Sequence, residues 1–452
     1  MTRAWIAVVA VVVIVLNAGV SHDTERALSA PGHALSLGDA VDGVRLLYTD
    51  SADPRRYFAY ANAVLGQPCS NYYVRSADAW RDEFAAGVER DPDLVPDLTP
   101  AHPLVPYRDF AVEYPPLQFS LVVPLAAVVH DADAFRVAFG VEMALVLALA
   151  LLLALRLARH VAPAVAGSRI VGWTALAALL LGGIVTHRFD AVVALALVAT
   201  LVAMVEDRPV WTGALLGVAI GLKLVPLVIG PILALRWVAV RRWGAIARGA
   251  VAATLAVVVT LGPLALLDSG GLGALLHYHA TRPLQVESTW AAGLRVLALV
   301  DGSRVDVVRS YGSINATGDH AATALVLSTL LLIGGLGAAI ALTWRRLARA
   351  VAEPERLLIL VRGALAALVI VMAVGKVFSP QYLIWLLPLA VPIALADGRR
   401  SLAVLAGILL ATQVIYPIGN VALQHGDAWV SVLVLARNLT LLVWAVRPLA
   451  AR

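Results

Sequence analysis

The chain has 452 residues, of which 60% are hydrophobic and 14% are charged. Soluble domains average roughly 45–50% apolar and about 25% charged residues, so this composition excludes a water-soluble protein. The net charge of +5 does not indicate a nucleic-acid-binding protein, because the basic residues stand in short clusters between apolar runs and form no continuous stripe.

Apolar runs long enough to cross a bilayer recur along the chain and predict an all-α, polytopic membrane bundle with about 11–13 membrane segments. The first run, from Trp5 to Val20, follows Arg3 as in a signal peptide. It lacks a clear cleavage site and further spans follow, so we expect a retained first helix. Residues 21–116 are mostly polar and far longer than a connection requires, which predicts a first outer loop.

The next apolar segments carry interruptions. Leu117–Val129 is short and contains Pro124, so it either crosses the membrane obliquely or re-enters it. Gly213–Trp237 carries Lys223 near its middle, and a lysine at the bilayer centre is costly. A helical hairpin with Lys223 near the outer surface would remove that cost.

The positive-inside rule places the basic clusters in the cytoplasm. The clusters are Arg156/Arg159/Arg169, Arg236/Arg241/Arg242/Arg248, Arg345/Arg346/Arg349/Arg356, Arg399/Arg400 and the tail from Arg447 to Arg452. The predicted spans of the second half are then 251–267, 321–343, 357–374, 382–396, 402–415 and 429–446. Residues 268–320 form a second outer loop, and residues 1–452 are expected to form one membrane-embedded domain.

The first loop contains a candidate catalytic carboxylate, Asp53. It precedes Pro54 and a helical pattern that ends at Gly66, which is typical of a helix start and stop. Asp53 is therefore either a helix cap or a functional carboxylate, and the two roles are compatible. Tyr57 and Tyr60 follow at helical spacing and either line a sugar site or lie at the lipid interface.

Further polar groups stand where the chain meets the membrane. Glu113, beside two prolines that fix the entry into the membrane, is either a solvated interface charge or a carboxylate aimed at a cleft. Arg188 and Asp190 either serve a site or pair with each other. Lys223 and Lys376 are functional hypotheses because charges at membrane depth are rare, although Lys376 could snorkel from a helix end.

The second loop carries His277 and His279 close to Arg282. Two histidines at this spacing, without further ligands nearby, are a weak signal for zinc. The single cysteine, Cys69, excludes both an intramolecular disulfide and a cysteine-rich metal site. Arg282 with a histidine nearby suits phosphate oxygens, which a guanidinium binds through two hydrogen bonds.

Taken together and in this order, these segments resemble glycosyltransferase family 87 of the GT-C superfamily, the polyprenyl-phosphate-dependent mannosyltransferases of actinobacteria. The matching segments are Asp53-x-x-x-Tyr57 with Gly66, Glu113–Leu117, Arg188–Asp190, Gly221–Pro226, Arg282–Ser288 and Ser379–Trp385. The chain departs from the family pattern at Gln67–Pro106, which is longer than the usual link.

The resemblance implies a GT-C fold with its active site between the first outer loop and the membrane surface. It also implies a loop-one aspartate as general base, which falls on Asp53 with Asp50 as a rival. We expect Arg282, Lys223, His277 and Lys376 to bind the donor phosphate. Substrate contacts are expected from Tyr57, Glu113, Tyr114, Arg188, Asp190, Gln285, Glu287, Gln381 and Tyr382. No metal and no cofactor are expected.

The implied activity is transfer of a sugar, mannose by resemblance, from a polyprenyl-phosphate donor to a cell-envelope glycolipid or glycan on the extracytoplasmic face of the cell membrane. The expected partners are these substrates and membrane lipids, without nucleic acid. An arabinosyl- or glucosyltransferase of the same fold is an alternative. Alternatives from other classes are a non-catalytic scaffold and a transporter or lipid flippase. The transporter predicts ionisable groups at the midplane and pseudo-symmetric halves, which the sequence does not show.

Overall fold

The structure of the protein, a computed structural model, describes residues 52–76, 79, 95, 97–267 and 269–450. The apolar run from Trp5 to Val20 lies outside the described residues, and so does Asp50. The expected first helix and the rivalry between Asp50 and Asp53 therefore stay predictions.

Within the described chain, seven helices are long and apolar enough to cross a membrane. They are α7 (Ala132–Val161), α8 (Gly167–Leu181), α12 (Trp243–Leu267), α15 (Ala321–Leu347), α16 (Glu353–Val374), α18 (Arg399–Gln413) and α20 (Ala428–Ala450). The shorter apolar helices are α6 (Phe119–Ala126), α9 (Asp190–Val205), α10 (Pro209–Leu222), α11 (Gly230–Val238) and α17 (Tyr382–Asp397). These segments confirm the predicted polytopic helical bundle.

The helices of the second half begin and end close to the predicted positions. α12 ends at Leu267, α15 begins at Ala321, α16 ends at Val374 and α17 begins at Tyr382. At each of these places the sequence changes abruptly from an apolar run to polar or proline-containing sequence. Such a change marks the depth at which the backbone leaves the hydrocarbon, so it can be read from the sequence.

The predicted hairpin around Lys223 is present. α10 ends at Leu222, and the chain turns through η4 (Val225–Ile229) into α11. Near the end of α11, Trp237 donates its indole N–H to Asp207 over 2.7 Å, and Asp207 lies just before the start of α10. The chain thus returns to the level at which α10 began, and Lys223 stands at the tip of the hairpin.

Small residues bring α10 and α12 into close contact. Gly213, Gly217 and Gly221 follow one another at four-residue intervals along α10, and a Cβ at any of them would overlap atoms of α12. Spacing of small residues by four lets membrane helices approach closely enough for backbone van der Waals contact. The contact fixes the height of the residue that follows, Lys223, relative to the rest of the bundle.

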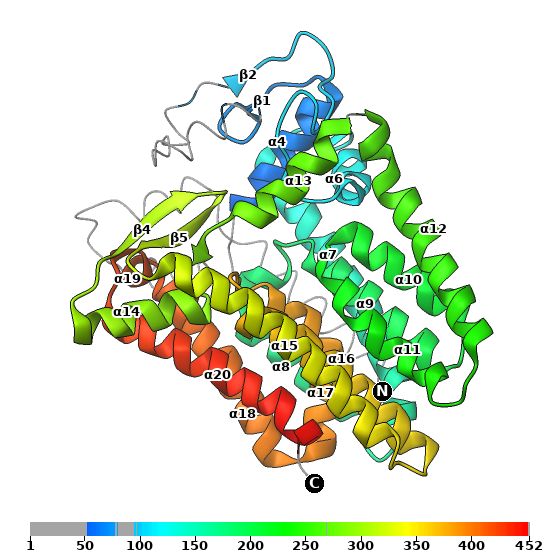
Figure 1. Ribbon diagram of the computed structural model, residues 1–452. Coiled ribbons are helices and arrows are strands. Elements are labelled where there is room, and N and C mark those ends of the chain that lie inside the picture. Colours follow the sequence, from blue (N-terminus) through cyan, green and yellow to red (C-terminus); the bar gives the residue numbers. More distant parts are fainter. Residues whose placement is uncertain (1–51, 77–78, 80–94, 96, 268, 451–452) are drawn as a thin grey trace.

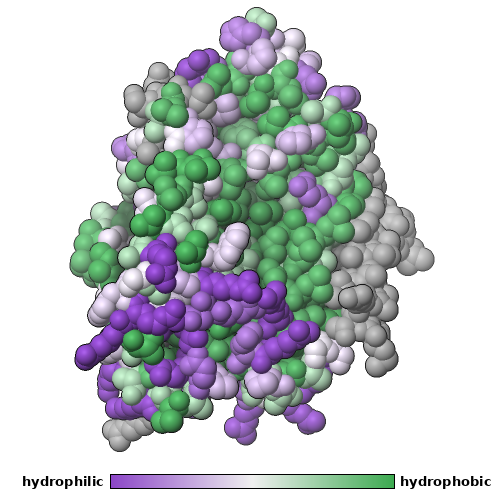
Figure 2. Space-filling model, turned by 90° about the vertical axis from the view of Figure 1, so that its right-hand side faces the viewer, coloured by the Kyte–Doolittle hydropathy of each residue, from purple (hydrophilic) through white to green (hydrophobic). Residues whose placement is uncertain are grey.

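The two ends of the bundle differ in charge. The turns between α11 and α12, α15 and α16, and α17 and α18 lie together at the lower end (Figure 1). Arg241 and Arg242 lie in the first of these turns, Arg345 and Arg346 in the last turn of α15, and Arg399 and Arg400 in the first turn of α18. Figure 2 shows the hydrophilic side chains gathered low on one face, below a broad hydrophobic band. This distribution matches the clusters that the positive-inside rule assigns to one side.

The opposite end carries the two long loops. The first contributes α4 (Ala52–Leu65) and a two-stranded sheet of β1 (Cys69–Ser70) and β2 (Asp97–Leu98), and η2 (Pro116–Gln118) leads into α6. The second contributes α13 (Ser269–Thr281), α14 (Thr289–Asp301) and the strands β3 (Leu284–Gln285), β4 (Val305–Ser310) and β5 (Ser313–Gly318). The remaining short elements are η3 (Gly182–Val185), η5 (Val414–Ile418) and α19 (Asn420–His425).

β4 and β5 form a hairpin that extends the sheet over the bundle (Figure 1). Its two-residue turn is Tyr311–Gly312, and both residues have positive φ. Two successive left-handed residues give the turn whose twist matches that of the flanking strands, and glycine tolerates this conformation without strain. β5 also pairs with β3, so the hairpin is anchored to the segment that leads into α14.

Candidate active site

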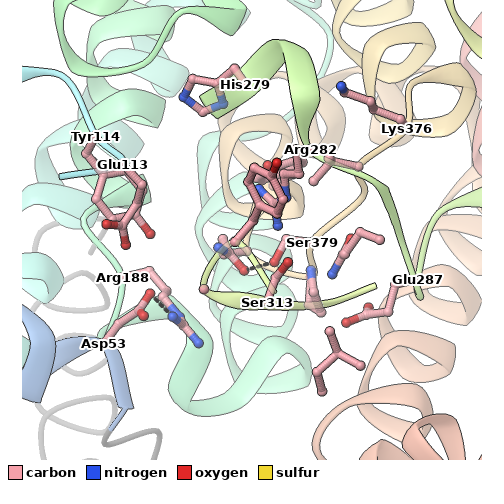
Figure 3. Close-up of a pocket in the computed structure, with 18 of the residues that line it drawn as sticks. Asp53, Glu113, Tyr114, Arg188, His279, Arg282, Glu287, Ser313, Lys376 and Ser379 are labelled. Atoms are coloured by element: carbon pink, nitrogen blue, oxygen red, sulfur yellow. Dashed lines mark hydrogen bonds and ion pairs between the residues drawn. The ribbon is translucent and has the colours of Figure 1, made fainter. Parts of the chain in front are cut away.

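A cavity of about 690 Å³ lies between the loop layer and the helices. Its lining comes from α4, the segment before η2, the segment before α9, the tip of the α10–α11 hairpin, α13, β3 and the residues after it, the β4–β5 hairpin, α15, the end of α16, the segment between α16 and α17, η5 and α19. Figure 3 shows some of these lining residues. These elements lie far apart in the sequence. The cavity is therefore a product of the fold and not of any one motif.

Asp53 lines this cavity in the first turn of α4. Its residue is only 4% exposed, and its carboxylate forms an ion pair with Arg188 (Figure 3). Arg56, one turn along α4, has its guanidinium 3.6 Å from the same carboxylate, and the Tyr57 hydroxyl donates to it over 3.4 Å. Asp53 is thus a buried carboxylate held between two cations beside a cavity.

Glu113 also lines the cavity and shares Arg56 with Asp53. Arg56 Nη1 donates to Glu113 Oε1 over 2.5 Å, and the Tyr60 hydroxyl donates to Oε2 over 2.8 Å. Glu113 is 5% exposed, so it is not a solvated interface charge. The sequence analysis overlooked Arg56, although its position three residues after Asp53 on a predicted helix is the spacing at which opposite charges meet.

Lys223 meets Asp190 and a set of aromatic rings. Its ammonium lies 2.9 Å from Asp190 Oδ1, which also accepts the indole N–H of Trp385 over 2.6 Å. The ammonium stands over the rings of Tyr114, Phe189, Tyr382 and Trp385 at 4.8–5.9 Å from their centroids. Asp190 is 1% exposed and does not line the cavity, whereas Lys223 does. Arg188 forms an ion pair with Asp53, and Asp190 forms one with Lys223.

Two cations gather on the α13 side of the cavity. Lys376 donates to the carbonyl of Ala280 over 2.7 Å, and Arg282 Nε has no hydrogen-bond partner among the described residues. No carboxylate in the described part of the chain forms an ion pair with either of them. Burial and the charge of Arg282 lower the pKa of Lys376. The ammonium of Lys376 is therefore held by a backbone carbonyl at the wall of the cavity.

Of the two histidines in α13, His279 lines the cavity and His277 does not. Successive helical residues are about 100° apart, so residues two apart point to nearly opposite sides. The expectation that His277 contacts the donor is therefore not supported, and His279 takes that position. Desolvation and the positive charge of Arg282 lower the pKa of His279 to about 4. Its imidazole is neutral at pH 7.

Gln285 and Glu287 follow β3 and line the cavity. Gln285 Oε1 accepts the backbone N–H of Phe378 over 3.0 Å, which joins β3 to the segment after α16. Glu287 is 5% exposed and lies 3.8 Å from Arg437, a residue of α20 that the sequence analysis passed over. Burial raises the pKa of Glu287 to about 7, although Arg437 and Arg188 act in the opposite direction.

The aromatic residues complete the walls. Tyr114 and Tyr382 line the cavity, and Tyr382 stacks on Trp385 with ring centroids 4.4 Å apart. Gln381 also lines it and accepts a hydrogen bond from the Ser379 hydroxyl. Tyr57 is buried behind the wall, in ring contact with Tyr114. Tyr57 therefore supports the site but is not part of the lining.

The β4–β5 hairpin covers part of the cavity. Tyr311 and Ser313 at its tip belong to the lining, and Tyr278 of α13 donates its hydroxyl to the carbonyl of Tyr311 over 2.5 Å. This cover could not be predicted from the sequence, because the contact joins two segments of the second loop that only the fold brings together. Across the described residues, no group of three or more His, Cys, Asp or Glu side chains could hold a metal ion.

The chain is similar to one solved structure and to one protein family. The solved structure of ArnT from Cupriavidus metallidurans in the apo state is similar with a TM-score of 0.39 and 16% sequence identity, over 90% of this chain and 77% of that chain. A comparison with curated proteins gives no match. The sequence profile of glycosyltransferase family 87 matches residues 112–380, which begin after Asp53 and after the long Gln67–Pro106 link. That match covers more than half of the chain, and the chain belongs to glycosyltransferase family 87.

Proposed function

We propose that this glycosyltransferase moves a sugar, most simply mannose, from a polyprenyl-phosphate donor to a glycolipid or glycan of the cell envelope. The observation that carries the proposal is a difference between the cavity's cations. Arg56, Arg188 and Lys223 each have a carboxylate partner, whereas Arg282 and Lys376 have none among the described residues. Two such cations, side by side at a cavity, suit the oxygens of a phosphate group.

The surroundings of these cations support a lipid-linked phosphate. Leu332 of α15 and Val371 of α16 contribute apolar side chains to the same cavity, and both helices are candidate membrane spans. A prenyl chain could lie against them while its phosphate meets Arg282 and Lys376. Because the basic turns lie at the other end of the bundle, the positive-inside rule favours a cavity on the extracytoplasmic side.

In the proposed step, Asp53 acts as general base. A hydroxyl of the acceptor gives its proton to the Asp53 carboxylate as its oxygen forms a bond to the anomeric carbon. The bond between that carbon and the phosphate oxygen breaks, and polyprenyl phosphate leaves with the bonding electrons. Arg282 and Lys376 stabilise the charge on the leaving phosphate. A single displacement of a β-linked donor would give an α-linked product.

Lys223 takes a different role from the one expected at first. Its charge is matched by Asp190, and four aromatic rings surround its ammonium. We assign it to holding the tip of the α10–α11 hairpin against α9 and α17. In that position it orders Tyr114 and Tyr382, whose rings line the cavity and could pack on the faces of a sugar.

The decisive experiment uses membranes that contain the full-length protein and compares labelled donors. Polyprenyl-phosphate mannose should be consumed with formation of a labelled envelope product, whereas a nucleotide-linked mannose should not. Polyprenyl-phosphate arabinose and glucose in the same assay distinguish the alternatives within the fold. Consumption of the nucleotide sugar, or of no lipid-linked sugar, would contradict the proposal. Movement of the lipid-linked sugar across the membrane without transfer would indicate a flippase.

A further inference from the structure

The segment that carries Glu287 is fixed on three sides. The backbone N–H of Val286 donates to Ile314 on β5 over 3.1 Å, and Ser288 caps α14 by accepting the N–H of Ala291 over 3.1 Å. The carbonyl of Glu287 accepts Asn438 Nδ2 over 3.0 Å. A side chain on such a backbone has few alternative positions, which is a requirement for a group that recognises a ligand by geometry.

The carboxylate of Glu287 is turned toward the cavity interior (Figure 3). Its residue is 5% exposed, and Oε2 is buried without a hydrogen bond from any described donor. A carboxylate can accept about four hydrogen bonds, and a buried one left unsatisfied is costly. Because Glu287 lines the cavity, its carboxylate places hydrogen-bond acceptor capacity in the wall of the site where a substrate would lie.

Arg437 stands behind this carboxylate. It is 2% exposed within α20, a candidate membrane helix, and its guanidinium lies 3.8 Å from Glu287 Oε2 and 4.2 Å from the ring centroid of Phe378. Its Nε donates to Asn438 Oδ1 over 2.9 Å. A buried arginine in a membrane helix is expensive and indicates a function by default. At 3.8 Å it supplies charge without occupying the carboxylate with a direct hydrogen bond.

We infer that Glu287 accepts hydrogen bonds from hydroxyl groups of the transferred sugar, and that Arg437 is a positioning residue that holds the Glu287 carboxylate in place and favours its ionised form. The inference rests on the proposed transferase activity and adds the residue that recognises the sugar. Carboxylates bind sugar hydroxyls well because each hydroxyl is a donor and the carboxylate only accepts.

The charge state of Glu287 gives this role a signature in the pH dependence. The charged groups that face it are Arg437 from α20 and Arg188 from the segment before α9, and burial outweighs both so that its pKa is about 7. A carboxyl group with a raised pKa is ionised above that value. The KM for the donor should therefore fall as the pH rises through about 7. His279 titrates near pH 4 and does not contribute in this range.

The test uses a set of polyprenyl-phosphate sugars that each lack one hydroxyl group, with binding and transfer measured on the full-length protein. The wild type should discriminate against at least one of them by about 10- to 100-fold, the cost of losing a hydrogen bond to a charged group. Glu287→Gln should lose most of that discrimination at the same hydroxyl position and lose the pH dependence near 7. Equal discrimination by wild type and Glu287→Gln would overturn the inference.

Variants of Arg437 separate positioning from mere stability. Arg437→Met should raise the donor KM about tenfold at pH 7 and recover at higher pH, because Glu287 then ionises at a higher pH. Arg437→Lys keeps a positive charge at this position, so its donor KM at pH 7 should stay close to that of the wild type. Arg295→Met removes another buried cation, one that donates to Leu423 O outside the cavity, and should leave the pH profile unchanged.

The outcomes distinguish this inference from the proposed function. A wild type that transfers none of the lipid-linked sugars but binds them with selectivity dependent on Glu287 contradicts the proposed function alone. A wild type that transfers mannose while Glu287 and Arg437 variants keep the same selectivity and pH profile contradicts the inference alone. A wild type that neither binds nor transfers them contradicts both. If Arg437→Met fails to fold, the Glu287→Gln comparison still decides.

Discussion

On the α4 side of the cavity, Asp53 and Glu113 share Arg56, and Asp53 also pairs with Arg188, whereas on the α13 side Arg282 and Lys376 meet no described carboxylate. On the α4 side, carboxylates of the protein itself balance the charges of the cations. The second side leaves positive charge that no carboxylate of the described residues balances. Because uncompensated charge at a partly buried site is costly, the second side is better explained by ligand binding than by stability.

The largest expected effect comes from removing the Asp53 carboxylate on the α4 side of the cavity. Asp53→Asn should lower kcat by about 10²- to 10⁴-fold, the usual contribution of a general base, with little change in donor binding. The measurement is transfer from polyprenyl-phosphate mannose in membranes with equal amounts of folded protein. Asp131→Asn is the matched control, since Asp131 caps the start of α7 away from the cavity and accepts the Ala134 N–H. Undiminished transfer by a folded Asp53→Asn protein would make Asp53 the wrong base.

The second largest loss of activity should come from replacing Arg282 on the α13 side of the cavity. Arg282→Gln removes a charge aimed at the leaving phosphate, and we expect a loss of about 10²- to 10³-fold in kcat/KM. Arg282→Lys should recover only part of this, because lysine cannot form the paired hydrogen bonds of a guanidinium. Arg304→Gln removes an exposed arginine of the same loop that pairs with Asp306, and it serves as the control. Equal activities of the Arg282→Gln and Arg304→Gln proteins would remove Arg282 from the phosphate site.

Lys376 should have a smaller effect that depends on pH. Its pKa is lowered by burial and by Arg282, so it loses its proton at a lower pH than an ordinary lysine. Donor affinity should therefore decline on the alkaline side, and Lys376→Arg should extend activity to higher pH because arginine stays charged. Lys376→Gln should raise the donor KM about tenfold at neutral pH. An alkaline limb that is the same in wild type and Lys376→Arg would assign it to another group.

The smallest effect is expected at the histidines. The pKa of His279 is about 4, so its imidazole stays neutral between pH 6 and 8 and cannot supply charge to the phosphate there. His279→Gln should change kcat/KM less than about tenfold and leave the shape of the pH profile in this range unchanged. His277→Gln, a change at the neighbouring histidine outside the cavity, should have no effect. A pH profile that shifts only in His279→Gln would show that this imidazole becomes charged during turnover.

Much of the bundle could be predicted from the sequence because the membrane imposes strong constraints on it. Apolar length predicted the spans from α12 to α20, and the cost of burying Lys223 predicted the hairpin. Each of these inferences uses only the sequence of a single segment. They also placed Asp53, Arg282 and Lys376 near one surface, and the structure brings all three to the same cavity.

The pairings could not be predicted in the same way. Arg188 was weighed as a partner for Asp190 because the two are close in sequence, yet it pairs with Asp53 across the fold. His277 was chosen over His279 because the helical phase of α13 was not recognised. Arg437 was overlooked because a single arginine in an apolar run has no local partner. For Arg188 and Arg437 the missing information was which segments become neighbours, and one sequence does not contain that in readable form.

The apolar lining from Leu332 and Val371 has a consequence for how the enzyme would meet its donor. A substrate delivered along these helices arrives by diffusion within a two-dimensional sheet, so its supply is set by its mole fraction among the lipids and not by its amount per volume. Adding inert lipid at constant donor and enzyme should slow the reaction. A donor shortened until it dissolves in water should lose this dependence on surface dilution.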